Sequence, residues 1–408
     1  MRLACYGWVD EDGGSVASAG HVVLAELVRL GIEVDLFAHQ DHIPRPRHLP
    51  PGAFRYFGFA QPRWLDRVDR LPGRLPLGLR KLLDPVYRRS WRTVYEVAVR
   101  REHRARPYDA VLNLHTQQIF SVDGVPNVTW LQGPFHTEVE AIRRLRRKIV
   151  AGSSHRFYLG LLAYYAYTQS LATHRKVKAD CVIVPSNWAR GRLVERLGIN
   201  VPVHALPYPI DLERFSPSPR LAQRCERPML LWVGRIDPRK RLDLLLEAFP
   251  LIKQEVPAAR LKIVGRLGYA PGAIQLLGRN PFGRDIEYVG EIPRSEVVPL
   301  LREASLLVQP SENENFGSSV AEAQACGTPV VIGPTNGTRD YIDANSSVFA
   351  SYDPPSLAEA VVQTVHRHCT NPMKSQKSAR DSAEKWFSPS SVATRLIEIL
   401  EGAVRSSH

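Results

Sequence analysis

The chain has 408 residues, which is more than one ordinary domain holds, so two or three domains are expected. Its 44% hydrophobic and 23% charged residues are typical of a soluble globular protein, and its formal net charge is +13. Five scattered cysteines without a C-x-x-C pair indicate reduced thiols and exclude a disulfide framework or a zinc-ribbon site. The N-terminus lacks the pattern of a signal peptide, and the longest uncharged stretch, 157–173, is shorter than the ~20 apolar residues of a membrane span. A cytoplasmic protein is therefore expected.

Short apolar runs alternate with helix-period stretches along the first half of the chain. The run "RLACYGWV" at 2–9 predicts a strand, apolar residues at helical spacing over 16–30 predict a helix, and "IEVDLFA" at 32–38 predicts a second strand. Together they form one β-α-β unit. Further strands are expected at "DAVLNLH", "NVTWLQ" and "CVIVPS". The proline-rich, irregular stretch 206–228 is expected to be a linker.

A second series of strands follows the linker. It comprises "MLLWVG", "RLKIVG", "IEYVG", "ASLLVQPS" and "PVVIG", most of them followed by a plausible helix. The pattern predicts an α/β protein of two doubly wound parallel sheets facing one cleft. We expect an N-terminal Rossmann-like domain at 1–205, the linker at 206–228, a second Rossmann-like domain at 229–380, and a C-terminal helix at 381–408 that crosses back to the first domain.

A candidate phosphate-binding segment begins where the first strand of the second series ends, at Gly234. Asp237 and the proline after it predict a helix N-cap, which puts Lys240 in the first turn and Arg235 in the preceding loop. Helix N-termini favour anions through free N–H groups and the helix dipole, and two cations strengthen that preference. The alternative is that both cations are solvated surface charges.

A second candidate segment is "SENENFGSSVAEAQACGTPVV" at 311–331. A strand is expected before it and a helix from about Ser318 to Cys326, ended by Gly327. Gly317 and the two serines after it then lie at the helix N-terminus, with Glu314 in the loop before it and Glu322 about one turn into the helix. Carboxylates only accept hydrogen bonds, so they suit the paired hydroxyls of a ribose or a sugar ring. The turn is expected to bind phosphates and the two acids the hydroxyl-bearing groups on either side.

These segments carry a family resemblance. "VGRIDPRKRLDLLLEAF", "SENENFGSSVAEAQACGTPVV" and "CVIVPSNWARGRLVERLGI" with "PYPIDLERFSP" resemble the retaining glycosyltransferases of family 4, which have the GT-B fold. The similarity extends in order over most of the chain. Many members have an Asn-Gly pair where this chain has Tyr208 and Pro209.

The resemblance implies that the domain at 1–205 binds the acceptor and the domain at 229–380 binds the nucleotide-sugar. It also implies a role for each matching residue. Arg235 and Lys240 are expected to bind the donor diphosphate, Glu314 the donor sugar and Glu322 the nucleotide ribose. The loop "GPFHTEV" is similar to one that brings a histidine, here His136, to the reacting centre. The remaining donor-site residues implied are Gly13, Gly14, Gly234, Phe316, Gly317 and Ser318. The donor is a UDP- or GDP-linked sugar, and neither a metal nor a cofactor is expected.

Other functions were weighed against this one. A nucleotide-sugar epimerase or hydrolase on the same fold would share the donor site but need no acceptor. A nucleic-acid-binding protein is suggested only by the basic composition, without a recognition motif. The acceptor is expected to be a glycan, a lipid-linked molecule or a small molecule.

The positive charge is concentrated in the predicted acceptor domain. The stretch 63–106 carries a net charge of +8 and 140–180 a net charge of +7, and both stretches include tryptophan or tyrosine. Basic residues beside aromatic residues are typical of interfacial segments. We expect either docking on the inner face of an anionic membrane or a solvated basic face, and no nucleic acid as partner.

Overall fold

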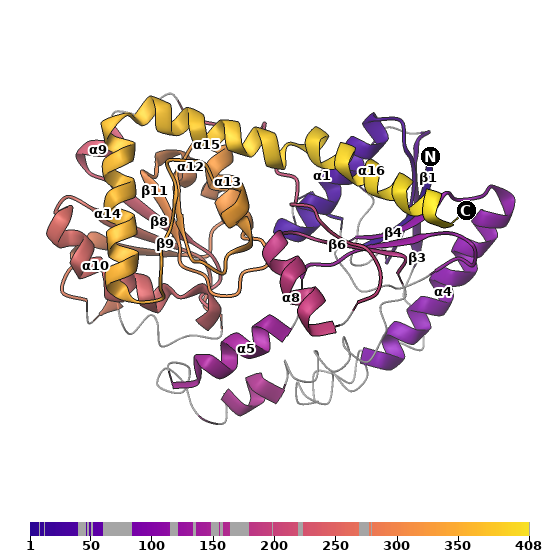
Figure 1. The fold of residues 1–408 in the computed structure, drawn as a ribbon, viewed down its shortest axis with the longest axis horizontal. Helices are drawn as coiled ribbons and strands as arrows, with labels where there is room; N and C mark the ends of the chain where they lie inside the picture. Colours follow the sequence, from indigo (N-terminus) through magenta and orange to yellow (C-terminus); the bar gives the residue numbers. More distant parts are fainter. Residues whose placement is uncertain are drawn as a thin grey trace.

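The computed structural model describes most of the chain. The residues outside this description are 8, 12, 40–45, 47–48, 50–51, 60–83, 115–120, 134–135, 148–154, 156–157, 164–178, 198, 219–222, 269–276, 279 and 408. Two parallel β-sheets, each flanked by helices, make up an N-terminal lobe and a C-terminal lobe that lie side by side (Figure 1). The two-sheet α/β architecture expected from the alternating apolar runs is confirmed.

The sheet of the N-terminal lobe has seven parallel strands in the order β3-β2-β1-β4-β5-β6-β7. The strands are β1 (Arg2–Gly7), β2 (Glu33–His39), β3 (Phe54–Phe59), β4 (Ala110–Leu114), β5 (Asn127–Trp130), β6 (Cys181–Val184) and β7 (Val203–Ala205). The labelled helices of this lobe are α1 (Ser15–Arg29), α4 (Asp84–Ala105), α5 (His136–Arg144) and α8 (Asn187–Leu197). The central strands β4, β5 and β6 are buried along their whole length, as expected for parallel strands that are covered on both faces.

The sheet of the C-terminal lobe has six parallel strands in the order β10-β9-β8-β11-β12-β13. They are β8 (Met229–Val233), β9 (Arg260–Val264), β10 (Ile286–Gly290), β11 (Leu306–Gln309), β12 (Val330–Ile332) and β13 (Ser347–Val348). The helical segments are α9 (Gln223–Glu226), η1 (Pro238–Lys240), α10 (Leu242–Glu255), η2 (Gly283–Asp285), α12 (Arg294–Glu303), α13 (Ser318–Ala325), η3 (Gly337–Tyr341), α14 (Pro354–Thr370) and α15 (Pro372–Phe387). Both sheets present the carboxyl ends of their strands at one edge, where ligands bind in this architecture.

Three strands were not predicted, and each lacks a clear sequence signal. β3 has the sequence "FRYFGF", in which an arginine and a glycine interrupt the apolar run. β7 and β13 contain only three and two residues. All three lie at sheet edges, where little of the strand is buried and pairing with one neighbour decides the structure.

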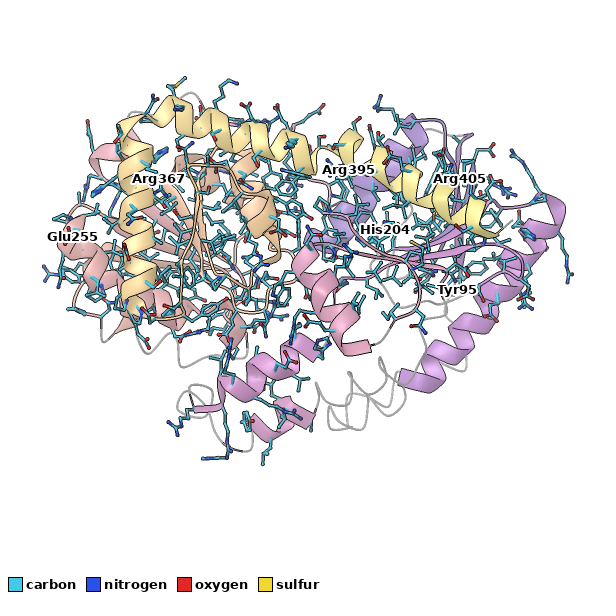
Figure 2. All side chains as sticks on the ribbon, in the orientation of Figure 1. Tyr95, His204, Glu255, Arg367, Arg395 and Arg405 are labelled. Atoms are coloured by element: carbon cyan, nitrogen blue, oxygen red, sulfur yellow. The ribbon has the colours of Figure 1, made fainter. Side chains whose placement is uncertain are left out.

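The chain ends on the lobe where it began. α15 packs against α13 in the C-terminal lobe, Ser388 interrupts the helix with an extended backbone, and α16 (Pro389–Ser407) packs against α1 and β5 in the N-terminal lobe (Figure 1). Arg395 and Arg405 mark the course of α16 along that lobe (Figure 2). The two lobes are therefore joined by two segments, the stretch after β7 and the α15–α16 connection.

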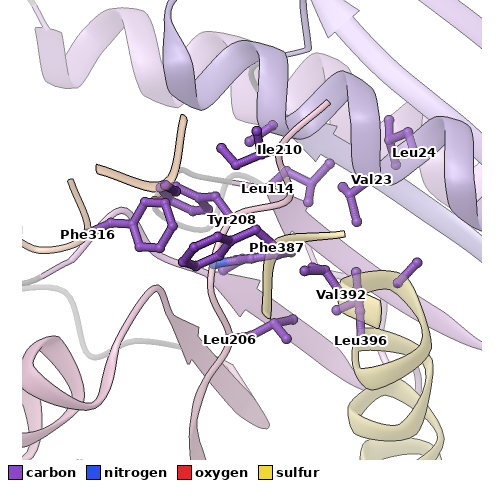
Figure 3. Close-up of a cluster of buried hydrophobic side chains, with 14 of the residues drawn as sticks. Val23, Leu24, Leu114, Leu206, Tyr208, Ile210, Phe316, Phe387, Val392 and Leu396 are labelled. Carbon is purple, nitrogen blue, oxygen red and sulfur yellow. The ribbon is translucent and has the colours of Figure 1, made fainter. Parts of the chain in front are cut away.

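A cluster of buried aromatic and aliphatic side chains joins these two segments, and we call it the junction cluster (Figure 3). The ring of Tyr208 lies 5.0 Å from that of Phe316, which in turn lies 5.7 Å from Phe387. Tyr208 belongs to the first connection and Phe387 to the second, whereas Phe316 directly precedes α13. Burial raises the pKa of the Tyr208 hydroxyl. The loop before α13 is thus packed on both connections between the lobes.

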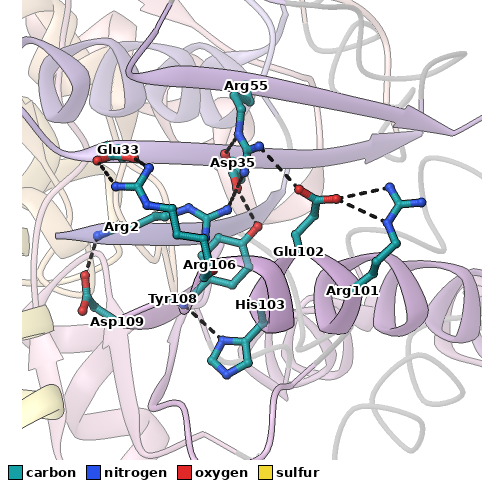
Figure 4. Close-up of polar contacts among 10 residues, drawn as sticks. All are labelled: Arg2, Glu33, Asp35, Arg55, Arg101, Glu102, His103, Arg106, Tyr108 and Asp109. Atoms are coloured by element: carbon teal, nitrogen blue, oxygen red, sulfur yellow. Dashed lines mark hydrogen bonds and ion pairs between the residues drawn. The ribbon is translucent and has the colours of Figure 1, made fainter.

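An ion-pair network lies at the amino ends of β1 and β2 (Figure 4). Asp35 is 2% exposed and accepts hydrogen bonds from Arg2, Arg55 and Tyr108. Burial alone would raise the pKa of Asp35, but these donors together lower it. The network therefore neutralises part of the positive charge of the N-terminal lobe. It lies at the amino ends of the strands, away from the edge where ligands bind.

Much of the basic, aromatic surface expected to face a membrane lies outside the described residues, including Trp64 and residues 164–167. In the part of the chain that the structure describes, no helix has both the length and the hydropathy required to cross a bilayer.

Candidate active site

The N-terminus of α13 is shaped by Gly317. This residue caps the helix in the left-handed region, with φ +94°, and a Cβ there would lie 3.0 Å from Oδ1 of Asn336. Glycine meets both constraints because it has no side chain and no penalty at positive φ. The predicted helix start at Ser318 and the predicted end near Cys326 and Gly327 are both confirmed. The first N–H groups of α13 have no acceptor within the helix, so they are available to an anion.

The segment after β8 differs from the expected continuous helix. Pro238–Lys240 forms a separate 3₁₀ turn, η1, and α10 begins only at Leu242. Between them Arg241 adopts a left-handed conformation with φ +49° and is 5% exposed. Asp237 precedes η1 but makes no capping hydrogen bond, and its carboxylate pairs with Arg235. The predicted helix is interrupted because the backbone turns sharply at Arg241, between the end of η1 at Lys240 and the start of α10.

Glu314 lies between two cations of η1. Its Oε1 is 3.1 Å from Nη1 of Arg239, and its Oε2 forms an ion pair with Nζ of Lys240. Glu314 is 7% exposed; burial would raise the pKa of its carboxyl, but Arg239 and Lys240 outweigh burial and lower that pKa to about 2. Lys240 and Glu314, predicted from separate motifs, are therefore in direct contact. Two positive charges and one negative charge leave the cluster net positive.

The backbone fixes Glu314 in this position. Its N–H donates to the carbonyl of Thr335 at 3.0 Å, and its own carbonyl accepts from the N–H of Gly337 at 2.8 Å. Gly337 approaches the loop so closely that a Cβ there would lie 2.1 Å from the carbonyl oxygen of Asn315. The loop 311–317 is thus held on one side by the residues that follow β12, and its carboxylate faces η1.

Glu322 lies on α13 and contacts a different cation. Its Oε1 is 2.5 Å from Nη2 of Arg294, the first residue of α12, and Glu322 is 6% exposed. The Arg294 guanidinium also lies 5.4 Å from the ring centre of Phe215. The two glutamates of the motif are therefore each paired with different cations, at two separate points around the start of α13.

The lobes meet through a buried carboxylate. Glu312 is 1% exposed; its Oε2 lies 2.7 Å from Nη1 of Arg241, and its other oxygen contacts Arg144 at the end of α5. We call Arg144, Glu312 and Arg241 the interdomain clamp. Nδ2 of Asn313 also donates to the carbonyl of Thr137 at 3.3 Å. Because α5 begins at His136, these contacts place the N-terminal residues of α5 next to the C-terminal lobe; His136 itself is 4% exposed.

A second interlobe contact lies at the start of α8, at the junction visible in Figure 1. Oγ of Ser186 donates to the carbonyl of Asn315 at 2.7 Å. Gly133, with φ +135°, lies so close to Asn315 that a Cβ there would be 2.3 Å from its Cγ. The loop between the two glutamates thus touches the N-terminal lobe on both sides.

The other residues predicted for the donor site lie outside the cluster that Glu314 forms with Arg239 and Lys240. Gly13 and Gly14 directly precede α1 in the N-terminal lobe, and in the described chain no contact joins them to Glu314. The backbone of Gly234 pairs with β9, its N–H donating to Val264 at 2.9 Å, and Phe316 is buried in the junction cluster. Arg235 is 40% exposed on its side chain and bonded to Asp237 rather than to the Lys240 cluster.

Several charged residues of this region were not predicted from the sequence. Arg239 and Arg241 flank Lys240 in the run "PRKR", where nothing distinguishes the buried cations from an exposed one. Arg294 lies outside both candidate segments, and Glu312 lies in the second without an expected role; their partners are 28 and 71 residues away. Within the described residues no group of histidine, cysteine, aspartate or glutamate side chains has the arrangement of a metal site.

Two parallel-sheet lobes, each flanked by helices, are the architecture of the GT-B fold. Residues 218–386 match the sequence family described as "Glycosyl transferases group 1". Over these residues the chain is similar to this family of glycosyltransferases. The match covers the linker end, both candidate motifs and most of α15.

The chain is similar to named relatives and to a solved structure. A D-inositol 3-phosphate glycosyltransferase of Streptosporangium roseum is 26% identical over 98% of this chain and 92% of that protein. A GDP-mannose-dependent alpha-(1-6)-phosphatidylinositol dimannoside mannosyltransferase of Mycobacterium tuberculosis is 31% identical over 46% of this chain and 50% of that protein. The chain spans about half the length of several curated relatives it matches. Sucrose-phosphate synthase from Thermosynechococcus elongatus has the same fold over 100% of both chains, with a TM-score of 0.68 and 17% identity.

Proposed function

We propose that the chain transfers a sugar from a nucleotide diphosphate-sugar to an acceptor hydroxyl with retention of the anomeric configuration. The observation that carries this proposal is the contact of Glu314 with Arg239 and Lys240 next to the N-terminus of α13. A diphosphate bound between η1 and α13 would meet two cations and several free N–H groups.

The chemistry follows from where charge develops. When the bond between the sugar and the β-phosphate breaks, negative charge grows on the phosphate oxygens and positive charge on the anomeric carbon. Lys240, Arg239 and the N–H groups at Gly317 are fixed donors for the departing phosphate, so they stabilise the transition state without reorganising. We propose that these groups take the place of a metal ion. Turnover that survives exhaustive treatment with EDTA supports this, and loss of turnover that Mg²⁺ restores refutes it.

In this proposal the two glutamates bind different parts of the donor. Glu314 faces the sugar hydroxyls, and Glu322 accepts a hydrogen bond from the ribose. Both are buried carboxylates, and they lie on either side of the α13 N-terminus, where the phosphates between sugar and ribose would bind. His136 begins the helix that the interdomain clamp holds against the C-terminal lobe, and it acts near the anomeric carbon. Arg235 must leave Asp237 before it can reach a phosphate, so its contribution is smaller than that of Lys240.

Retention and transfer are tested separately. Thermal-shift screening against UDP, GDP and their sugars identifies the donor, because a ligand of the folded state raises the melting temperature. NMR of the first product formed then reports the anomeric configuration. An inverted product refutes retention. An epimerase or hydrolase would instead consume the donor at full rate without acceptor, which release of nucleoside diphosphate measures directly.

We propose that the acceptor bears a polyol ring and is either a soluble inositol phosphate or a lipid-linked glycan. This rests on the printed activities of two relatives, a D-inositol 3-phosphate glycosyltransferase and a phosphatidylinositol dimannoside mannosyltransferase. A lipid-linked acceptor requires a peripheral position on the inner membrane face, and the basic stretches 63–106 and 140–180 are the candidate contact. Co-sedimentation with vesicles containing anionic lipid, at low and high salt, tests the position. Absence of binding at low salt refutes it and favours the soluble acceptor.

A further inference from the structure

The pairing of Glu322 with Arg294 is not part of the motif that suggested a ribose contact. Arg294 begins α12, and its guanidinium lies between two elements: Nη2 is 2.5 Å from Oε1 of Glu322 on α13, and the ring of Phe215 lies 5.4 Å from the guanidinium carbon. Phe215 is fully buried and belongs to the connection after β7. The side chain of Arg294 is therefore held from two directions and has little freedom to rotate.

This contact leaves the two oxygens of Glu322 in different states. Oε1 accepts from Arg294, whereas Oε2 has no hydrogen bond or ion pair with a side chain in the described part of the chain. An arginine–carboxylate bond also fixes the plane of the carboxylate, since the guanidinium is planar and its N–H directions are rigid. Glu322 thus presents one oriented acceptor instead of a freely rotating pair.

The guanidinium has a further feature that a purely structural ion pair does not require. Nη1 of Arg294 is buried and has no hydrogen-bond partner among the described residues. A buried unpaired donor is unfavourable, and such groups in native proteins are uncommon. A hydroxyl both donates and accepts, so a single ribose hydroxyl beside this pair can donate to Oε2 and bring a lone pair to the guanidinium.

We propose that Arg294 is a positioning residue for the nucleotide, which orients Glu322 and thereby makes the site select a ribose over a deoxyribose. This inference rests on the proposed function, in which Glu322 accepts from the ribose. Arg294 acts through Glu322 and not on the phosphates. Its loss should therefore lower the preference for the ribose rather than weaken all nucleotides equally.

The test measures affinity ratios by calorimetry with the full chain. UDP and GDP are compared with their 2′-deoxy and 3′-deoxy forms, in the wild type and in Arg294→Gln, Arg294→Lys, Glu322→Gln and the double variant Arg294→Gln/Glu322→Gln. Arg284→Gln removes the same charge at an exposed position of the same lobe and serves as the control. Inorganic diphosphate, which lacks a ribose, is titrated in parallel.

For the wild type we expect the ribose form to bind about 10-fold or more tightly than one of the deoxy forms, the range for a hydrogen bond to a charged group. Glu322→Gln and Arg294→Gln should each lower that ratio several-fold, and the double variant no further than Glu322→Gln alone, because both act on one contact. Arg294→Lys should restore part of the ratio. Affinity for inorganic diphosphate should change less than twofold in Arg294→Gln.

The outcomes separate this inference from the proposed function. If Glu322→Gln lowers the ratio but Arg294→Gln and Arg294→Lys do not, the positioning role is wrong and the donor site stands. An equal loss of all affinities in Arg294→Gln, with the ratio kept, shows a general electrostatic effect and also overturns it. If Glu322→Gln keeps the wild-type ratio, or no nucleotide binds, the ribose contact itself is wrong and the inference fails with it.

Discussion

Replacing Glu314 by glutamine is expected to tighten the binding of a nucleoside diphosphate while lowering turnover. Glu314 contacts both Arg239 and Lys240 in the structure. A diphosphate that binds these cations must compete with the carboxylate for them. Glutamine keeps the shape of the side chain but removes the competing charge, so the cations become available to the ligand. The donor sugar loses a charged contact at the same time, which lowers turnover.

The magnitude follows from the electrostatics of the cluster. Burial raises the pKa of Glu314, but Arg239 and Lys240 lower it overall from 4.5 to about 2. One pKa unit corresponds to 1.36 kcal/mol, so the surroundings favour the carboxylate by roughly 3 kcal/mol. We take this net preference as the scale of the competition, about two orders of magnitude in Kd. If removing the carboxylate gives a third of this free energy to ligand binding, the affinity for the nucleoside diphosphate rises about 5-fold.

The assay is calorimetric titration of the wild type and Glu314→Gln with UDP and with GDP. Glu303→Gln removes a negative charge at an exposed position of α12 and controls for net charge. We expect about 5- to 100-fold tighter binding in Glu314→Gln alone, for the nucleotide that the wild type prefers. Unchanged or weaker binding in a variant that melts like the wild type would refute the competition.

The other predictions concern the same cluster and the contacts between the lobes. Lys240→Ala should lower turnover by ~10²–10³-fold with the fold intact, the range for losing one charge-stabilising donor; steady-state kinetics checks it, and near-normal turnover contradicts it. Because the folded pKa of Glu314 is depressed, its stabilisation is present above pH ~4.5 and is lost as pH falls towards 2. The free energy of unfolding in urea should therefore fall more steeply from pH 5 to pH 3 in the wild type than in Glu314→Gln. Arg144→Gln should raise amide exchange in α5, while Arg143→Gln, an exposed neighbour, should not; equal exchange in both would rule out the interdomain clamp. Phe387→Ala should cost ~3–5 kcal/mol of stability by chemical denaturation, because the side chain is fully buried, and a cost under 1 kcal/mol would be inconsistent with its packing.

The sequence predicted the architecture and the bounds of α13 correctly because both depend on local patterns. Continuous apolar runs separated by helix-period stretches specify buried parallel strands and their crossover helices. Gly317 and Gly327 mark the ends of α13, since both have positive φ, where glycine is favoured. The spacing between Glu314 and Glu322 put the first in the loop before α13 and the second within α13, where the structure has them.

Only the tertiary structure decided which charges meet. Lys240 and Glu314 are 74 residues apart, and Arg294 and Glu322 are 28 apart. Such pairs form because the parallel strands of one sheet bring their carboxyl ends to one edge, and no local periodicity encodes them. The clamp between Glu312 and Arg144 depends in addition on how the two lobes pack, through the junction cluster and α16. The left-handed turn at Arg241 was also unforeseen, because a buried arginine at positive φ is stable only where the fold supplies its partners.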